Sequence, residues 1–229
     1  MAELRSKGSE SIKKILLKHG VKEPFFGVKV EHLKLIEKKI KKDYQLAKDL
    51  YATGNADAMY LAGLIADDHK MTIADLNSWV RQAVSQNIFE YTVPWVAAEG
   101  RHGYELALQW IDNSEEHIAA AGWATLGALV SLKNDADLDI ASLKSLLARI
   151  VRDIPSAKNR IRHTMNGFVI SVGVYVTSLT EDAIAAARKI DVVTADKNGT
   201  AAKLPNAVEY ILKMKERGAL GKKKKTVKC

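Results

Sequence analysis

A pattern of helical character recurs 60 residues further along the chain, and this internal repeat constrains the fold more than any other feature. The segment Tyr44-Gln-Leu-Ala-Lys-Asp-Leu aligns with Tyr104-Glu-Leu-Ala-Leu-Gln-Trp. A third, weaker copy runs from Leu143 through Arg160 to Val176. Each copy has the pattern of a short helix, a turn and a longer helix rich in small residues, and such a pair must stack on its neighbours to bury its apolar face. The repeat predicts an all-α superhelix with a concave face suited to a long ligand; the alternative is an ordinary helical bundle with a coincidental similarity.

Apolar residues at helical spacing mark five helices in the first part of the chain. The sets are Ile12/Ile15/Leu16, Val30/Leu33/Ile36/Ile40, Leu46/Ala47/Leu50/Tyr51, Ala58/Leu61/Ala62/Ile65 and Leu76/Trp79/Val80/Ala83. No segment alternates at period two, and the 229 residues include only four prolines, so nothing favours a sheet. We expect a single helical domain over residues 1–220. Residues 221–229 form a basic tail, which is expected to be disordered on its own because it has few apolar groups.

Charge is distributed unevenly along the chain. Residues 1–48 hold 13 Lys and Arg against 6 Asp and Glu, and residues 140–229 hold 18 against 7. Between them, residues 49–139 hold 4 against 14. Two basic ends therefore flank an acidic middle, and basic regions attract polyanions such as double-stranded DNA. The alternative is a solvated surface whose acidic patch happens to be central.

The sequence gives no sign of a metal, a cofactor or a membrane. Cys229 is the only cysteine, so no internal disulfide forms, which fits a reducing cytoplasm. The six histidines are scattered and no glycine pattern matches a nucleotide-binding motif. The N-terminus has no signal-like apolar core, and no apolar stretch has the length of a membrane span. We expect a cytoplasmic, nucleoid-associated monomer without metal or cofactor.

A basic cluster opens the helix of the third repeat copy. Lys158, Arg160, Arg162 and His163 follow Ser156, which has the residue type of an N-cap. Basic side chains and free amides at a helix start together suit a phosphate, and the alternative is a solvated first turn. The remaining candidate DNA-binding residues are Lys203, Lys222, Lys223, Lys224 and Lys225.

An aromatic stretch with one carboxylate lies in the acidic middle. It runs Phe89-Glu-Tyr-Thr-Val-Pro-Trp and ends at Trp95. An aromatic wall beside a carboxylate stabilises a cationic transition state, such as that of glycosidic bond cleavage. The alternative is packing, because most tryptophans in helical repeats lie in the core, and we expect this for the majority of Trp79, Trp95, Trp110 and Trp123.

Three segments resemble the AlkD-type DNA alkylation repair family. They are Phe26-Gly-Val-Lys-Val-Glu-His-Leu-Lys-Leu-Ile, then Ala47-Lys-Asp-Leu with Ala62-Gly-Leu-Ile-Ala-Asp, and Arg162-His-Thr-Met-Asn-Gly-Phe-Val. The resemblance covers roughly residues 25–190. It implies a HEAT-like solenoid that cradles duplex DNA in a basic concave groove. It also implies excision of N3- or N7-alkylated purines, which family members achieve without drawing the base into a pocket.

The catalytic pattern of that family is only partly present. The resemblance places the first family tryptophan on Phe89, the aspartate on Val93, the arginine among residues 119–121 and the second tryptophan on Phe168. The aromatic character is kept, whereas the carboxylate and the arginine are missing. The nearest acid is Glu90, one residue past Phe89 and therefore about 100° around a regular helix. We take Glu90 as the candidate catalytic residue, and Phe89, Trp95 and Phe168 as candidate substrate-binding residues.

Three functional hypotheses follow. The first is a DNA-binding solenoid with weak or absent base excision. The second is an active alkylpurine DNA glycosylase that uses Glu90 or another acid, such as Glu99. The third is a non-catalytic scaffold whose acidic middle binds a basic protein.

Overall fold

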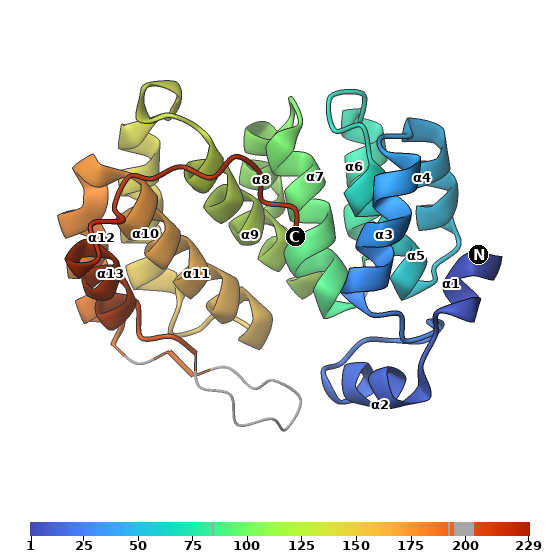
Figure 1. The fold of residues 1–229 in the computed structure, drawn as a ribbon. Coiled ribbons are helices and arrows are strands. Elements are labelled where there is room, and N and C mark those ends of the chain that lie inside the picture. Colours follow the sequence, from blue (N-terminus) through green and yellow to red (C-terminus); the bar gives the residue numbers. More distant parts are fainter. Residues whose placement is uncertain (84, 192, 195–203) are drawn as a thin grey trace.

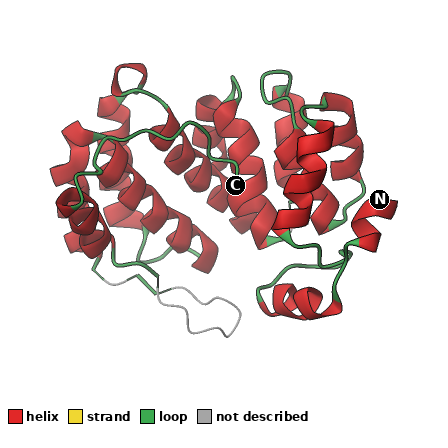
Figure 2. Cartoon of the chain, viewed as in Figure 1, coloured by secondary structure: helices red, strands yellow, loops and turns green. Residues whose placement is uncertain are grey.

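The fold consists of helices stacked in an arc (Figure 1). The structure, a computed structural model, describes residues 1–83, 85–191, 193–194 and 204–229, and these contain helices, turns and loops but no strand (Figure 2). The α-helices are α1 (Ala2–Ser6), α2 (Glu10–Lys18), α3 (Val30–Ile40), α4 (Tyr44–Ala52), α5 (Ala56–Ile65), α6 (Ile73–Gln82), α7 (Val93–Glu99), α8 (Gly103–Trp110), α9 (Glu116–Leu132), α10 (Ile140–Asp153), α11 (Asn159–Tyr175), α12 (Thr180–Ile190) and α13 (Ala207–Glu216). A π-helical turn, η1 (Ile88–Thr92), precedes α7, and the 3-10 turns η2 (Asp135–Asp137) and η3 (Thr177–Leu179) precede α10 and α12.

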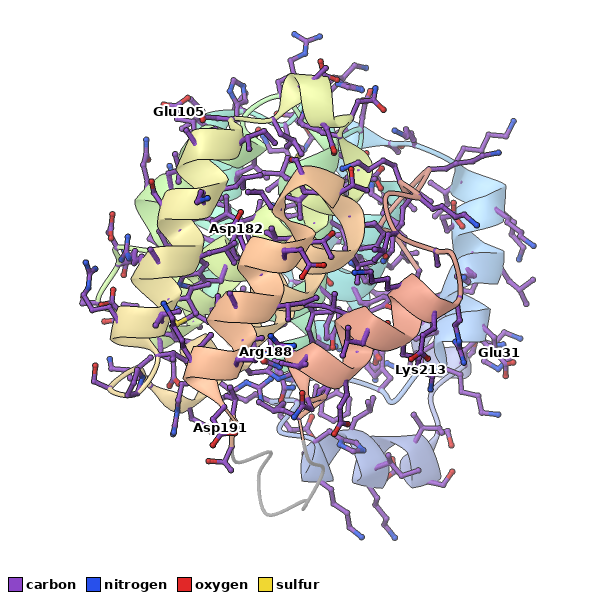
Figure 3. The ribbon with its side chains drawn as sticks, turned by 90° about the vertical axis from the view of Figure 1, so that its left-hand side faces the viewer. Glu31, Glu105, Asp182, Arg188, Asp191 and Lys213 are labelled. Carbon is purple, nitrogen blue, oxygen red and sulfur yellow. The ribbon has the colours of Figure 1, made fainter. Side chains whose placement is uncertain are left out.

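Consecutive helices pair as the repeat predicts. The three repeat copies correspond to α4 with α5, α8 with α9, and α10 with α11. Helices α6 and α7 fill the position between the first two copies, a pair that the sequence comparison did not reveal. The second helices of the pairs, α5, α7, α9, α11 and α13, pack side by side into one layer, which we call the inner layer. The first helices, α4, α6, α8, α10 and α12, form the outer layer. Figure 3 views the array from its α12–α13 end, with Arg188 on α12 and Lys213 on α13.

Two clusters of buried side chains form most of the core. The first extends from Leu4 to Ala121 and the second from Ala98 to Ile211, so they adjoin around α7, α8 and α9. All four tryptophans are buried, which confirms the packing expectation for them. Burial at this scale is the main stabilising contribution to the array.

Asp57, on α5, fixes the backbone of the Phe26-Gly-Val segment. Its buried carboxylate accepts hydrogen bonds from the backbone amides of Phe26, Gly27 and Val28, at 2.6, 3.0 and 3.2 Å. Gly27 has φ +76°, and a Cβ there would approach Ser9 O to 2.6 Å. This part of the family resemblance therefore reflects a structural anchor between the N-terminal loop and α5.

The C-terminal segment, residues 218–229, lies along the inner layer. From α13 it passes α11 and α9 and ends near α7 and α5 (Figure 1). Its backbone donates from Gly221 to Val174 O (2.8 Å), from Lys224 to Ser131 O (2.8 Å) and from Val227 to Glu99 Oε1 (2.9 Å). We call this segment the strap.

The far end of the strap contacts the other half of the molecule. Val227 packs against the first core cluster. Lys228 Nζ pairs with the buried carboxylate of Asp68 at 2.6 Å, and Cys229 Sγ hydrogen-bonds with the Tyr60 hydroxyl at 3.1 Å. The expectation of a disordered tail is therefore wrong: the lysines and polar backbone have specific partners on the inner layer, which composition alone does not reveal.

Asp75 connects α4 to the start of α6. Thr72 and Asp75 form a capping box. Asp75 also accepts a hydrogen bond from the Tyr44 hydroxyl and pairs with Lys48 Nζ, both at 2.8 Å. Burial by itself raises the pKa of Asp75, but hydrogen bonds from Lys48, Thr72 and Tyr44 outweigh it and lower the pKa to about 2 from 3.8.

This arrangement makes stability depend on acid pH. The folded-state pKa lies below the unfolded one, so the carboxylate stabilises the fold above about pH 4, and this contribution is lost as the pH falls toward about 2. We expect Asp75→Asn to lower the free energy of unfolding by about 2 kcal/mol at neutral pH, with the difference from wild type shrinking below about pH 4. Urea unfolding across this range measures it. A difference in stability that does not change with pH would contradict the lowered pKa of Asp75. The control is Asp67→Asn, because Asp67 pairs, among the described residues, only with Lys70, whose side chain is 68% exposed.

No single helix among the described residues is long and apolar enough to cross a bilayer. Residues 159–175 and 177–190 together meet the criteria of length and composition, but the two segments are bent by 114° at the break between them.

Candidate nucleic-acid interface

The inner layer holds a cavity of about 390 Å³ near its centre. Its walls come from η1 and the start of α7, from α9 and from α11, and the strap contributes Lys224, Val227 and Cys229. The aromatic lining residues are Tyr91, Trp95, Trp123, Phe168 and Tyr175. Segments far apart in sequence thus meet at one aromatic-lined hollow, which we call the inner cavity.

A buried ion pair lies at the edge of the inner cavity. Glu90, on the π-helical turn, accepts hydrogen bonds at Oε1 from Arg160 Nε (2.6 Å) and from Arg160 Nη2. At Oε2 it accepts from Gln86 Nε2 (3.3 Å), and His163 Nε2 lies 3.6 Å away. The side chains of Glu90 and Arg160 are 2% and 12% exposed. The candidate catalytic carboxylate therefore already has a cationic partner 70 residues further along the chain.

The start of α11 differs from the sequence expectation. The helix begins at Asn159 with Lys158 as N-cap, whereas the Ser156 hydroxyl donates to Asp153 O (3.2 Å). The Arg160 amide donates to Glu116 Oε1 at 2.6 Å, and Lys158 Nζ donates to Ser114 O at 2.9 Å. This first turn is bound to the start of α9, so the prediction that the Arg160 amide and side chain are open to a phosphate is wrong.

The three candidate aromatic residues do not share one site. Trp95 and Phe168 both line the inner cavity. Phe89 is buried elsewhere, next to the His117 ring at 6.2 Å, in a separate hollow of about 300 Å³. The expected grouping of Phe89 with Trp95 and Phe168 is therefore wrong, because the π-helical turn directs Glu90 and Tyr91 toward the cavity instead.

The positions that the resemblance assigns to the family's aspartate and arginine carry no polar chemistry. Val93 is fully buried, and Ala119, Ala120 and Ala121 are buried in α9. Glu99, the other acid considered, binds the strap through the Val227 amide and the Thr226 hydroxyl. Glu99 therefore has a structural partner outside the inner cavity.

The candidate basic residues are in different environments. Lys223 Nζ donates to Val130 O and pairs with Asp135 at 2.8 Å. Lys224 Nζ lies 5.7 Å from the centre of the Tyr175 ring, beside the inner cavity. Lys222 and Lys225 are exposed, and Arg162 is half-buried. Lys203 lies outside the described residues.

Sequence reasoning missed a second basic site. Lys38, Lys41 and Lys42, at the end of α3, line a hollow of about 370 Å³ together with Lys228 of the strap, and the carboxylates of Glu37 and Glu99 line it as well. Lys42 pairs with Asp68, but no carboxylate within the described residues lies at ion-pair distance from Lys38 or Lys41. We call Lys38 and Lys41 the α3 lysines. The excess of lysine in residues 1–48 was the available signal, but it did not indicate which lysines face the strap.

Within the described part of the chain, no three His, Cys, Asp or Glu side chains come together in a group that could hold a metal ion.

A curved stack of helix pairs, with an aromatic cavity in its inner layer, defines a HEAT-like repeat protein. The chain belongs to the family described as DNA alkylation repair enzyme, whose model matches residues 1–211. A solved structure matches all of the chain and 97% of its own, with 34% identity and a TM-score of 0.93. It is described as a new family of proteins related to the HEAT-like repeat DNA glycosylases with affinity for branched DNA structures.

Two bacterial relatives extend over nearly the same length. An uncharacterized protein of Listeria innocua and one of Listeria monocytogenes are each 28% identical over 222 residues, covering 94% of this chain and 95% of their own. The family and the superhelical fold inferred from the sequence are therefore confirmed, and the ordinary-bundle alternative is wrong.

Proposed function

We propose that this protein binds DNA, branched DNA included, along its inner layer and does not excise alkylated bases. The observation that carries the proposal is the match over the whole chain to a structure whose family is described as having affinity for branched DNA structures. At 34% identity and a TM-score of 0.93, the two chains share the same overall fold over their whole length. Membership in the DNA alkylation repair enzyme family supports the same class of ligand.

Cations on the strap, which lies along the inner layer, and at the neighbouring end of α3 supply the phosphate contacts. The α3 lysines lie near one end of the strap, and Lys222, Lys224 and Lys225 lie on the strap itself. These groups are distributed along the path of the strap, so they suit the phosphates of more than one duplex arm. Phosphate neutralisation releases counterions, and the affinity therefore falls steeply with salt.

The α3 lysines provide a direct test. We expect Lys38→Gln combined with Lys41→Gln to weaken junction binding roughly tenfold and to reduce the salt slope by about 2, because each phosphate contact contributes about one unit. Fluorescence anisotropy with a labelled four-way junction, and with a duplex of the same sequence, measures both quantities. The matched control is Lys144→Gln combined with Lys189→Gln on outer-layer helices α10 and α12. An equal loss in the control, or no loss in either, would contradict this surface.

The absence of base excision follows from the state of Glu90. A carboxylate that stabilises a cationic sugar acts through its uncompensated negative charge, whereas Glu90 is buried and balanced by Arg160. We expect no release of 7-methylguanine from methylated DNA above the spontaneous rate. Release that is faster than spontaneous and is abolished in Glu90→Gln would reinstate the glycosylase hypothesis.

A further inference from the structure

We propose that the inner cavity receives one unpaired base from the branch point of bound DNA. The inference rests on the proposed function and adds a specific ligand, an unstacked nucleobase, to a specific place. At about 390 Å³ the cavity lies within the size range of small-molecule sites, about 300–1,000 Å³.

Gly167 lies on the open side of the inner cavity. Gly63, Gly122 and Gly173, which also lie within helices, stand where a Cβ would collide with a neighbour at 2.4, 2.7 and 2.4 Å. Those glycines therefore have a packing reason. Gly167 is an exposed residue in the middle of α11 that lines the cavity on its open side, and a Cβ there would meet nothing within 4 Å.

A glycine without a packing reason weakens its helix. In a helix interior it costs about 1 kcal/mol relative to alanine. Gly127 faces the same cavity from α9, where a Cβ would approach Ser171 Oγ to 3.3 Å. Small residues on both facing helices thus leave a gap that larger side chains would fill.

The walls of the cavity suit a flat aromatic ligand. Trp95 packs edge-on against Tyr60, with ring centres 5.3 Å apart, and Tyr91 lies 6.0 Å from Trp95. Phe168 is fixed from the opposite side by an edge contact with Trp123 at 5.5 Å. Tyr91 is 47% exposed and forms part of the mouth, whereas Trp95 and Phe168 are 6% and 1% exposed and form the floor, so Tyr91 offers the accessible stacking surface. Stacking on aromatic side chains contributes about 1–3 kcal/mol per base and tolerates any base.

The charges at the cavity suit a base that is attached to a phosphate chain. Lys224 lies at the strap side of the cavity, in position for a phosphate beside the inserted base. On the opposite side the Glu90 carboxylate is balanced by Arg160, so it does not repel a polyanion as an isolated carboxylate would. Branch points supply such bases at low cost, because a base there is already unpaired or weakly stacked.

The test is photocross-linking with a three-way junction that carries one unpaired 5-iodouracil at the branch. We expect efficient cross-linking of wild-type protein, mapped by mass spectrometry to peptides containing Tyr91, Trp95 or Phe168. The Gly167→Leu variant, which fills open space, should lower the cross-link yield at least tenfold at saturating protein. Ala148→Leu, at an exposed position on outer-layer helix α10, should leave it unchanged.

The possible results separate the two proposals. Junction binding without a cross-link at these aromatic residues, or with a cross-link that survives Gly167→Leu, would refute the base-binding cavity and leave DNA binding intact. Failure of the wild-type protein to bind the junction at low salt would refute both.

Discussion

Arg160→Ala is expected to lower the free energy of unfolding by about 3–5 kcal/mol, the cost of removing the guanidinium that balances a buried carboxylate. The Glu90 side chain is 2% exposed, and its principal cationic partner is the Arg160 guanidinium. The substitution also removes the side chain that joins α11 to the π-helical turn. Urea unfolding followed by circular dichroism measures the loss.

Two further variants separate the buried charge from other effects of the substitution. Adding Glu90→Gln to Arg160→Ala removes the buried charge that Arg160 balanced and should recover a large part of the lost stability. Arg152→Ala is the control, because Arg152 also pairs with a carboxylate, Asp153, but is 74% exposed, and such pairs contribute about 0–1 kcal/mol. A fully stable Arg160→Ala protein with reduced DNA affinity would show that Arg160 contacts phosphate, as the sequence predicted.

Deleting residues 219–229 is expected to destabilise the protein by about 3 kcal/mol or more. The deletion removes the apolar contact of Val227 and the amide donor to Glu99, and it leaves the buried Asp68 with only Lys42, whose side chain is 57% exposed. Hydrogen bonds to charged groups contribute about 1.5–3 kcal/mol each. Thermal unfolding measures the loss, and hydrogen exchange should show faster exchange at the ends of α5 and α7.

Single substitutions in the strap locate the effect. Lys228→Ala should reproduce much of the destabilisation because it removes the 2.6 Å pair with Asp68. Lys225→Ala, at an exposed position of the same strap, should leave stability within about 0.5 kcal/mol of wild type. An unchanged melting temperature after the full deletion would mean that the strap is not bound in solution.

Much of the fold was predictable because the repeat is encoded locally. Tyr44 and Tyr104 open equivalent helices, and the apolar spacing from Val30 to Ile40 matches α3 from end to end. Helix α6 was predicted from Leu76, Trp79, Val80 and Ala83, whereas its partner α7 was missed because the intervening π-helical turn changes the spacing of apolar residues. Because of this turn, Tyr91 and Glu90 line the inner cavity and Phe89 does not.

The candidate site was less predictable because its contacts join residues far apart in the chain. Trp95 and Phe168 were correctly identified as candidates, and both line the same cavity. The sequence around Arg160 predicted that its side chain binds phosphate. Nothing in the adjacent sequence indicated that Glu90, 70 residues earlier, would pair with it. The strap lysines illustrate the same limit: composition describes how a segment behaves alone and cannot show that Asp68, Glu99 and Ser131 are placed to bind it.

The position of Cys229 allows a direct test of where DNA binds. As the only cysteine, it accepts a benzophenone maleimide at the end of the strap, beside the inner cavity. Ser145→Cys, in a Cys229→Ser background, places the same probe on exposed outer-layer helix α10. With a bound four-way junction, we expect irradiation to cross-link DNA strongly from Cys229 and at background level from position 145. Equal yields from the two positions, or a higher yield from the outer layer, would contradict DNA binding by the inner layer.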